Sequence, residues 1–238
     1  MGGDFSLWVY LTGTPLLWLT VTLTAYVAAD RIAAATNRHP LANPVLISVV
    51  FVGSVLAFTG TPYPTYFEGA QFVHFLLGPA TVVLAMPLYE RRATVVRALV
   101  PMLAALAAGA ATTLACVIAL ARLLDLPAPI IVSLAPKSVT SGVAMGIAET
   151  LGGDPTLTAI LVILTGIIGA ILVTPMMEAL RIRDMRARGF AAGLAAHGIG
   201  TARAFQVSET AGTFAGIAMG LNAFLTAILA PLALHLMS

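Results

Sequence analysis

Long apolar runs without a charged side chain are the feature that most constrains this chain. Residues 98–121 and residues 157–177 contain no Lys, Arg, Asp or Glu. A transmembrane helix needs about 20 consecutive, mostly apolar residues. Only 9% of all residues are charged, whereas soluble domains average about 25%. The sequence therefore predicts an all-α, polytopic membrane protein.

Apolar segments and their breaks predict one transmembrane domain over residues 1–238, with about six full spans. Residues 72–89 contain Pro79 and Pro87, and proline interrupts a helix. Residues 59–70 are rich in turn-forming residues and are expected to form an external loop. The expected uninterrupted spans are residues 7–29, 44–58, 98–120, 157–177 and 210–236.

Short clusters of arginine between the apolar segments orient the chain. They comprise Arg31 and Arg38, then Arg91, Arg92 and Arg97, then Arg181, Arg183, Arg186 and Arg188. Cytoplasmic loops of membrane proteins carry such an excess of basic residues. A nucleic-acid-binding protein would instead present one larger basic patch. The basic clusters therefore predict orientation in a lipid bilayer and not a nucleic-acid partner.

The arginine clusters also predict a broken region after residue 125. If the clusters at 31–38 and 91–97 are cytoplasmic, residue 125 lies outside. The cluster at 181–188 must be cytoplasmic again, so an odd number of crossings separates residue 125 from residue 181. Two segments lie there, so residues 127–153 are expected to enter and leave on the same side. Residues 190–205 are too rich in glycine for a simple span. We therefore divide the chain into N-terminal spans (1–125) and a half with broken helices (126–238).

Lys137 is the only lysine, and it lies within the broken region. A lysine at the centre of a membrane helix costs about 2.5–3.5 kcal/mol on insertion scales. It can snorkel to the interface or pair with a carboxylate such as Glu149. Alternatively, Pro136 starts a half-helix whose free N–H groups join the ammonium in binding a small anion. Hydroxyl groups for a second polar group of that ligand are supplied by Ser138, Thr140 and Ser141.

A second polar cluster lies in "AAHGIGTARA", residues 195–204. His197, Thr201 and Arg203 are added to the candidate substrate site, with Arg203 as an interfacial anchor in the alternative. His197 and Glu149 are candidates for proton coupling, since histidine titrates near neutral pH. Asn222 in the last span is a weaker candidate, because membrane amides more often join helices.

Internal similarities suggest duplicated, inverted repeats. GPATV at 78–82 resembles APKSV at 135–139, which adds Thr81 to the candidates through its match to Ser138. SGVAMGI at 141–147 resembles AGIAMGL at 215–221, and LTAIL occurs at 157–161 and 225–229. Chance similarity is the alternative in so alanine-rich a chain. In transporters, paired broken segments indicate the binding site.

No enzyme signature accompanies these residues. The sequence contains no HExxH, GxSxG, Walker loop or CxxC, and Cys116 is its only cysteine. These signatures carry most metal, nucleophilic and phosphate chemistry that a sequence reveals. We therefore expect neither catalytic residues, nor a metal site, nor a cofactor.

The blocks LAPKSVTSGVAMGIAETLGGDPTLTA, ARGFAAGLAAHGIGTARA and AGIAMGLNAFLTAILAP resemble the LrgB/CidB family. That family includes bacterial proteins named for effects on murein hydrolase export and autolysis, and a plastid glycolate/glycerate translocator. The resemblance implies transport of small hydroxy- or keto-monocarboxylates such as glycolate, glycerate, pyruvate or lactate, by alternating access. The competing hypothesis is a holin- or antiholin-like regulator of murein hydrolases.

The resemblance also implies where the chain works and with what. We expect a multi-pass protein of the bacterial inner membrane, assembled as a homodimer or higher homo-oligomer. A small membrane protein of the LrgA/CidA type is a further implied partner.

Overall fold

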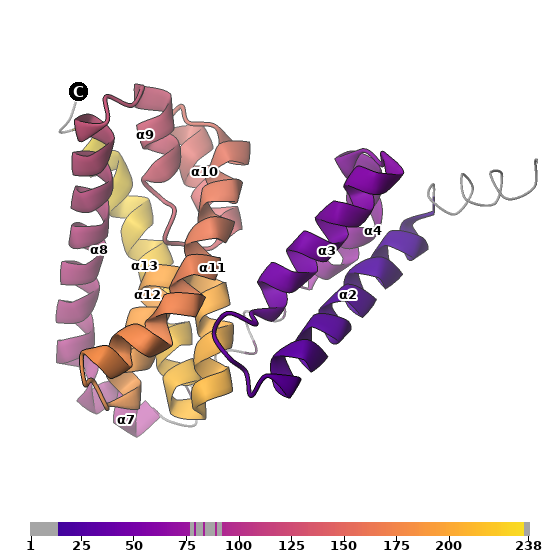
Figure 1. The fold of residues 1–238 in the computed structure, drawn as a ribbon. Helices are drawn as coiled ribbons and strands as arrows, with labels where there is room; N and C mark the ends of the chain where they lie inside the picture. The colour runs from indigo at the N-terminus through magenta and orange to yellow at the C-terminus, as the bar shows by residue number, and fades with distance from the viewer. Residues whose placement is uncertain (1–13, 77–78, 80–82, 84–88, 90–91, 236–238) are drawn as a thin grey trace, which may run out of the picture. The chain divides into compact units, whose positions relative to one another are not determined.

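The computed structural model describes residues 14–76, 79, 83, 89 and 92–235, and every regular element in these ranges is a helix. Four helices are long and apolar enough to cross a bilayer: α2 (Pro15–Ala35), α8 (Leu99–Leu123), α11 (Pro155–Ala179) and α13 (Glu209–His235). The shorter apolar helix α3 (Pro44–Thr59) follows α2 in the sequence (Figure 1). The prediction of an all-α, polytopic membrane protein is confirmed.

Packing divides the chain into two compact units, residues 1–83 and residues 84–238. In the first, α2 packs against α3 and against α4 (Tyr63–Phe75). Trp18 of α2 is fully buried and meets the ring of Tyr66 edge to face, with centroids 6.0 Å apart. The hydroxyl groups of Thr22 and Tyr66 lie 3.1 Å apart. The boundary thus falls before α8, which packs with the broken helices predicted for the C-terminal half.

Helix α4 overturns the prediction that residues 59–70 form an external loop. Pro62 is the N-cap residue of α4, and a second proline, Pro64, lies in its first turn. Proline suits a helix start, because the first N–H groups of a helix have no partner within it. Two prolines that indicate a loop in the sequence therefore begin a helix here.

Side chains placed just before three helices explain where those helices begin. Asn43 accepts hydrogen bonds from two N–H groups at the start of α3, and Asp154 does the same for α11. Asp184 accepts from the N–H of Arg186 at the start of α12 (Met185–Val207). Such caps pair N–H groups that the helix itself leaves unpaired. The side-chain hydrogen bond from Arg186 also holds the pKa of Asp184 below its ordinary value.

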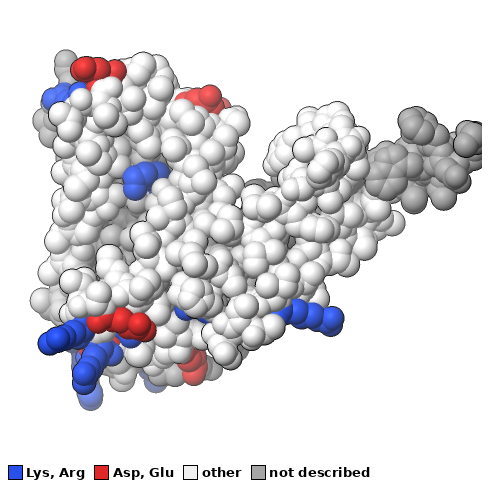
Figure 2. All heavy atoms as spheres, viewed as in Figure 1, with Lys and Arg blue, Asp and Glu red and all other residues white. Residues whose placement is uncertain are grey.

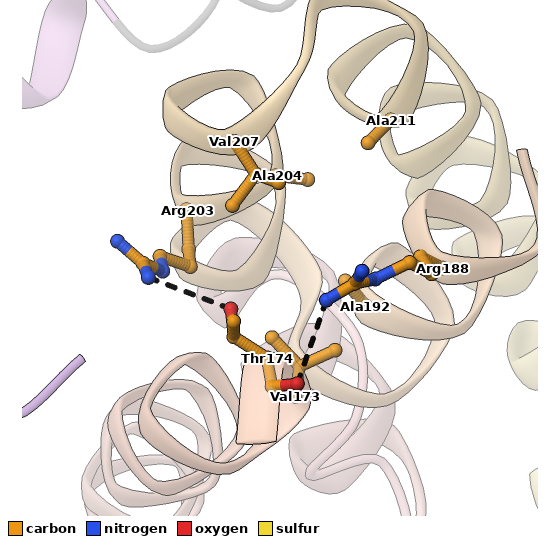
Figure 3. Close-up of a pocket in the computed structure, with 8 residues that line it drawn as sticks. All are labelled: Val173, Thr174, Arg188, Ala192, Arg203, Ala204, Val207 and Ala211. Carbon is orange, nitrogen blue, oxygen red and sulfur yellow. Dashed lines mark hydrogen bonds between the residues drawn. The ribbon is translucent and has the colours of Figure 1, made fainter. Parts of the chain in front are cut away.

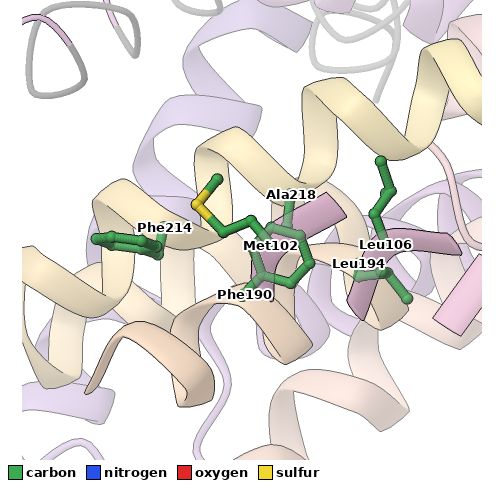
Figure 4. Close-up of a cluster of buried hydrophobic side chains, with 6 residues drawn as sticks. All are labelled: Met102, Leu106, Phe190, Leu194, Phe214 and Ala218. Carbon is green, nitrogen blue, oxygen red and sulfur yellow. The ribbon is translucent and has the colours of Figure 1, made fainter. Parts of the chain in front are cut away.

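A buried apolar cluster joins the beginnings of three helices in the second unit (Figure 4). Its members are Met102 and Leu106 of α8, Phe190 and Leu194 of α12, and Phe214 and Ala218 of α13. The short helix α7 (Arg92–Arg97) precedes α8, and its Val95 packs on this cluster. The arginines before α8 and those before α12 therefore lie at one end of the unit, as the positive-inside rule requires.

Helix α12 is a hairpin whose chain reverses at Ala196 and His197. Both residues have non-helical backbone angles, and His197 has a positive φ of 40°. A Cβ on Gly200 would lie 2.7 Å from the Cβ of Ala196 and against the carbonyl of Ala192. The second arm thus returns along the first. The hairpin starts and ends at the arginine-rich end of the unit.

Helix α13 starts directly after this hairpin and runs parallel to its first arm. A Cβ on Gly189 would overlap the carbonyl of Ala211, and a Cβ on Gly193 would overlap that of Ala215. The four-residue spacing is the same on both helices, so the glycines let the backbones pack in direct contact. The first arm and α13 therefore pack with their backbones in direct contact at these two positions.

A second helix–break–helix element lies at the other end of α11. It consists of α9 (Ala128–Leu134), a turn, and α10 (Ser141–Thr150). Its end returns to its beginning, since the Ser133 hydroxyl accepts a hydrogen bond from the N–H of Asp154 at 2.8 Å. One hairpin precedes α11 and the other follows it, so the two enter from opposite ends of that span (Figure 1).

The two hairpin-plus-span units, α9–α10–α11 and α12–α13, form an inverted arrangement, yet the matching sequence blocks do not fall at equivalent places. SGVAMGI starts the second arm of its hairpin, whereas AGIAMGL lies inside α13. LTAIL begins near the start of α11 but lies in the second half of α13. The repeat therefore lies in the topology and not in these blocks.

Replacing Gly193 by Ala should destabilise the protein by about 1–3 kcal/mol, as overpacked interiors generally do. The new methyl group would overlap the carbonyl of Ala215. The matched control is Gly220→Ala in α13, where a Cβ meets nothing within 4 Å. Thermal unfolding in detergent, followed by circular dichroism, should separate the two variants; equal melting temperatures would contradict the close approach.

Candidate functional site

Lys137 lies in the turn between α9 and α10, half-buried. Figure 2 shows a single basic group in the middle of the otherwise uncharged surface of the second unit, apart from the charged groups gathered at its ends. The N–H of Lys137 donates to the carbonyl of Leu134 and that of Val139 to Pro136. Pro136 thus belongs to the turn, which corrects the prediction that it starts the half-helix.

The half-helix begins at Ser141, with Thr140 as its N-cap residue. The Thr140 side chain makes no capping hydrogen bond. The first N–H group to find a helical partner is that of Ala144, which donates to the Thr140 carbonyl at 2.9 Å. The N–H groups that precede it carry the partial positive charge of a helix start. An ammonium and a helix N-terminus therefore lie three to four residues apart along one turn.

His197 forms the tip of the opposite hairpin and is 4% exposed. Its Nε2 atom lies 2.9 Å from the carbonyl oxygen of Val162 in α11. The ring reaches that helix because residue 166 is glycine; a Cβ there would lie 2.6 Å from the ring. The hydroxyl of Thr201 donates to the carbonyl of His197 at 2.8 Å. The His197 side chain thus fastens the reversal to α11, and Thr201 of the second arm hydrogen-bonds the backbone of the reversal.

Asn222 of α13 joins the two breaks. Its side-chain amide donates to the carbonyl of Ser138 at 3.2 Å and to the carbonyl of Leu194 at 3.1 Å. The first acceptor belongs to the turn that holds Lys137, and the second to the last turn before the reversal at His197. Asn222 is only 2% exposed. The hairpins therefore meet at one buried amide.

The residues at the two hairpin tips lie close to one another. Lys137 lies within electrostatic range of His197, and within range of Cys116 on α8. The structure thus brings together Pro136, Lys137, Ser138, Thr140, Ser141, His197, Thr201 and Asn222, through shared turns and the hydrogen bonds of Asn222.

Three further candidates lie elsewhere. Glu149 is exposed in the last turn of α10, about 12 Å along the helix from Ser141. The ion pairs of the described residues do not join it to Lys137. Arg203 lies on the returning arm of α12, where its Nη2 atom is 3.5 Å from the hydroxyl of Thr174. Thr81 falls outside the described residues.

Sequence reasoning missed two residues, Gly166 beside the His197 ring and Arg188 at the base of the α12 hairpin. Gly166 was read as part of a uniform span, and nothing around it in the sequence marks it as the seat of a histidine ring. Arg188 was assigned only to the cytoplasmic loop, yet it lines a pocket together with Arg203 (Figure 3). The hairpin fold of α12 brings these two arginines together, and only knowledge of the reversal would have found them.

Replacing Asn222 by Ala should remove the donor from two buried carbonyl groups. An unsatisfied buried polar group costs about 1–3 kcal/mol, so the free energy of unfolding should fall by about that amount. Hydrogen exchange should rise at residues 137–141 and 194–198 together. The control is Thr226→Val, since its hydroxyl makes only a long 3.4 Å contact with the Asn222 oxygen. Faster exchange at one break alone would contradict the bridging role.

Comparison with known proteins places the chain in a family. The model of the LrgB-like family matches residues 22–236. YwbG of Bacillus subtilis strain 168 is 32% identical over 219 residues, which cover 92% of this chain and 97% of YwbG.

The holin-like protein CidB of Staphylococcus epidermidis strain RP62A is 30% identical over 222 residues, 93% of this chain and 96% of CidB. YxaC of Bacillus subtilis is 32% identical over 223 residues, with 93% and 96% covered. No solved structure matches the chain. The chain is a multi-pass membrane protein that belongs to the LrgB-like family.

Proposed function

We propose that this protein carries small hydroxy- or keto-monocarboxylates across the membrane, at a site between the two hairpin tips. The observation that carries the proposal is the bridge from Asn222 to the carbonyls of Ser138 and Leu194. Irregular backbone at membrane depth is tolerated where it is buried in protein or lines a cavity. In transporters, such breaks are where substrate and coupling ions bind.

The chemistry at the first tip suits a carboxylate. The ammonium of Lys137 supplies a full charge, and the start of α10 supplies N–H groups directed at the same turn. Together they offer charge-assisted hydrogen bonds to the two oxygens of a carboxylate. The hydroxyls of Thr140 and Ser141 can bind an oxygen on the neighbouring carbon, which a 2-hydroxy or 2-keto acid possesses.

His197 is proposed as the group that couples the opposite hairpin to this site. When its Nε2 donates to the Val162 carbonyl, Nδ1 of the neutral ring is an acceptor for a substrate hydroxyl or a proton. Glu149 is exposed at the far end of α10 from the site. We therefore propose it only as a relay that passes protons between the site and the solution outside the cell. Hairpins entering from opposite ends of α11 give each side of the membrane an element that can open alternately.

A second candidate is a holin-like role in permeabilising the membrane or regulating murein hydrolases. The printed name of CidB, a relative over nearly its whole length, favours it. This role needs no substrate site and predicts leakage without saturation. For either candidate, we propose residence in the bacterial inner membrane, a homo-oligomer, and cooperation with a small LrgA/CidA-type membrane protein.

Replacing Lys137 by Met should reduce uptake of labelled glycolate or pyruvate into proteoliposomes to the level of empty liposomes. Methionine preserves the length of the side chain but lacks the charge that holds the carboxylate. The control is Lys137→Arg, which keeps the charge and should retain part of the uptake. Reconstituted protein should be quantified for each variant, so that lost expression is not read as lost transport.

The same vesicles separate the two candidates. A carrier gives saturable counterflow that unlabelled substrate accelerates and that discriminates between acids. A holin-like channel releases glycolate and an uncharged solute of similar size alike, with no saturation. Uptake that is unchanged in Lys137→Met would remove Lys137 from the site, and non-selective leakage would overturn the carrier.

A further inference from the structure

A pocket at the base of the α12 hairpin differs in chemistry and place from the site between the tips. It is lined by Val173 and Thr174 of α11, Arg188 and Ala192 of the first arm, Arg203, Ala204 and Val207 of the second arm, and Ala211 of α13 (Figure 3). Its walls are small and apolar apart from two guanidinium groups and Thr174. It therefore combines an apolar lining with two cations.

Both arginines point at the same residue from different arms. The Nη2 atom of Arg188 lies 3.5 Å from the carbonyl oxygen of Thr174, and that of Arg203 lies 3.5 Å from its hydroxyl oxygen (Figure 3). Charge-assisted hydrogen bonds to a carboxylate or phosphate are typically about 2.7–2.9 Å long. Arg203 also contacts the side-chain oxygen of Gln206 at 3.4 Å. These contacts to neutral oxygens are all longer than the hydrogen bonds that a bound oxyanion would give.

Glu178 is the acidic group that the structure places beside this pair. Its Oε1 atom lies 3.8 Å from Nη2 of Arg188, and its side chain is 67% exposed, whereas that of Arg188 is 14% exposed. The 3.8 Å separation is longer than a charge-assisted hydrogen bond of about 2.7–2.9 Å, and the carboxylate is largely solvated. It therefore offers little competition to an anion that enters the pocket between the two forks.

We propose that this pocket binds an oxyanion, a phosphate or carboxylate group, between Arg188 and Arg203. The planar fork of each guanidinium matches two oxygens of such a group. Two sources carry this chemistry: the phosphodiester of an acidic phospholipid, or a free anion on the arginine-rich side. Acidic lipids of the cytoplasmic leaflet gather beside basic residues. The proposal is independent of the carrier function, because none of the lining residues belongs to the hairpin tips.

A bound oxyanion would tie the two arms of the α12 hairpin to the end of α11. Arg188 lies at the beginning of the hairpin and Arg203 near its end, so an anion shared by both closes the base. Occupancy would thus brace the base of the hairpin whose tip carries His197.

The test measures anion binding by the purified full-length chain and by Arg188→Gln and Arg203→Gln. Native mass spectrometry counts retained phosphatidylglycerol against phosphatidylcholine, and equilibrium binding uses labelled inorganic phosphate. Each glutamine variant should bind about tenfold more weakly, since it loses a charged hydrogen-bond partner. The matched control is Arg183→Gln, an exposed arginine in the connection between α11 and α12 that does not line the pocket.

Loss of phosphatidylglycerol alone identifies a lipid site, and loss of phosphate binding identifies a soluble anion; either supports the proposal. Binding that is equal in wild type and both glutamine variants overturns it. An equal loss in Arg183→Gln also overturns it, because attraction to the whole basic end would then suffice. If a glutamine variant does not fold, the corresponding lysine variant replaces it, with a smaller loss expected because charge is kept and the fork is not.

Discussion

The side-chain amide of Asn222 is the contact on which the arrangement of the second unit depends. Breaking a helix inside a membrane frees carbonyl and N–H groups, and lipid offers them no partner. One freed carbonyl follows Lys137 and another precedes His197, and the same NH₂ group reaches both. A polar residue inside a span is generally a helix-joining contact. Here it joins two breaks, so each hairpin tip fixes the depth of the other.

Much of this arrangement follows from the sequence by counting arginine clusters. That argument required a re-entrant element near residues 127–153, and glycine-rich residues 190–205 were expected to be interrupted. The sequence did not reveal that α12 reverses at His197, because reversals are expected at glycine and Gly198 and Gly200 lie beside it. The positive φ falls on the histidine instead, since the Val162 carbonyl and the open face of Gly166 hold its ring.

The reversal also explains why Arg203 lies away from the site between the hairpin tips. Along a straight helix, Arg203 would lie less than two turns beyond His197. On a returning arm, the same six residues carry it back to the arginine-rich end, beside Arg188. Residues 59–70 show the same limit at shorter range, since proline indicates a loop in sequence and a helix start in structure. Local composition identified the special segments but not the direction in which the chain leaves them.

The two hairpins at opposite ends of α11 are both tied to that helix and to α13. The first arm of α12 packs on α13 with carbonyls against Gly189 and Gly193, so this arm can move only together with α13. The α9–α10 hairpin is tied to the start of α11 through Ser133, which contacts the N–H of Asp154 and the hydroxyl of Thr158. Its turn is joined to α13 by the amide of Asn222, and Val139 of the same turn lies in a buried cluster with Val162 of α11 and Ala223 of α13. The opposite tip contacts α11 through His197 and α13 through the carbonyl of Leu194. In the proposed carrier, a tip that opens therefore has to break contacts with both α11 and α13, and the Asn222 amide is the contact that the two tips share.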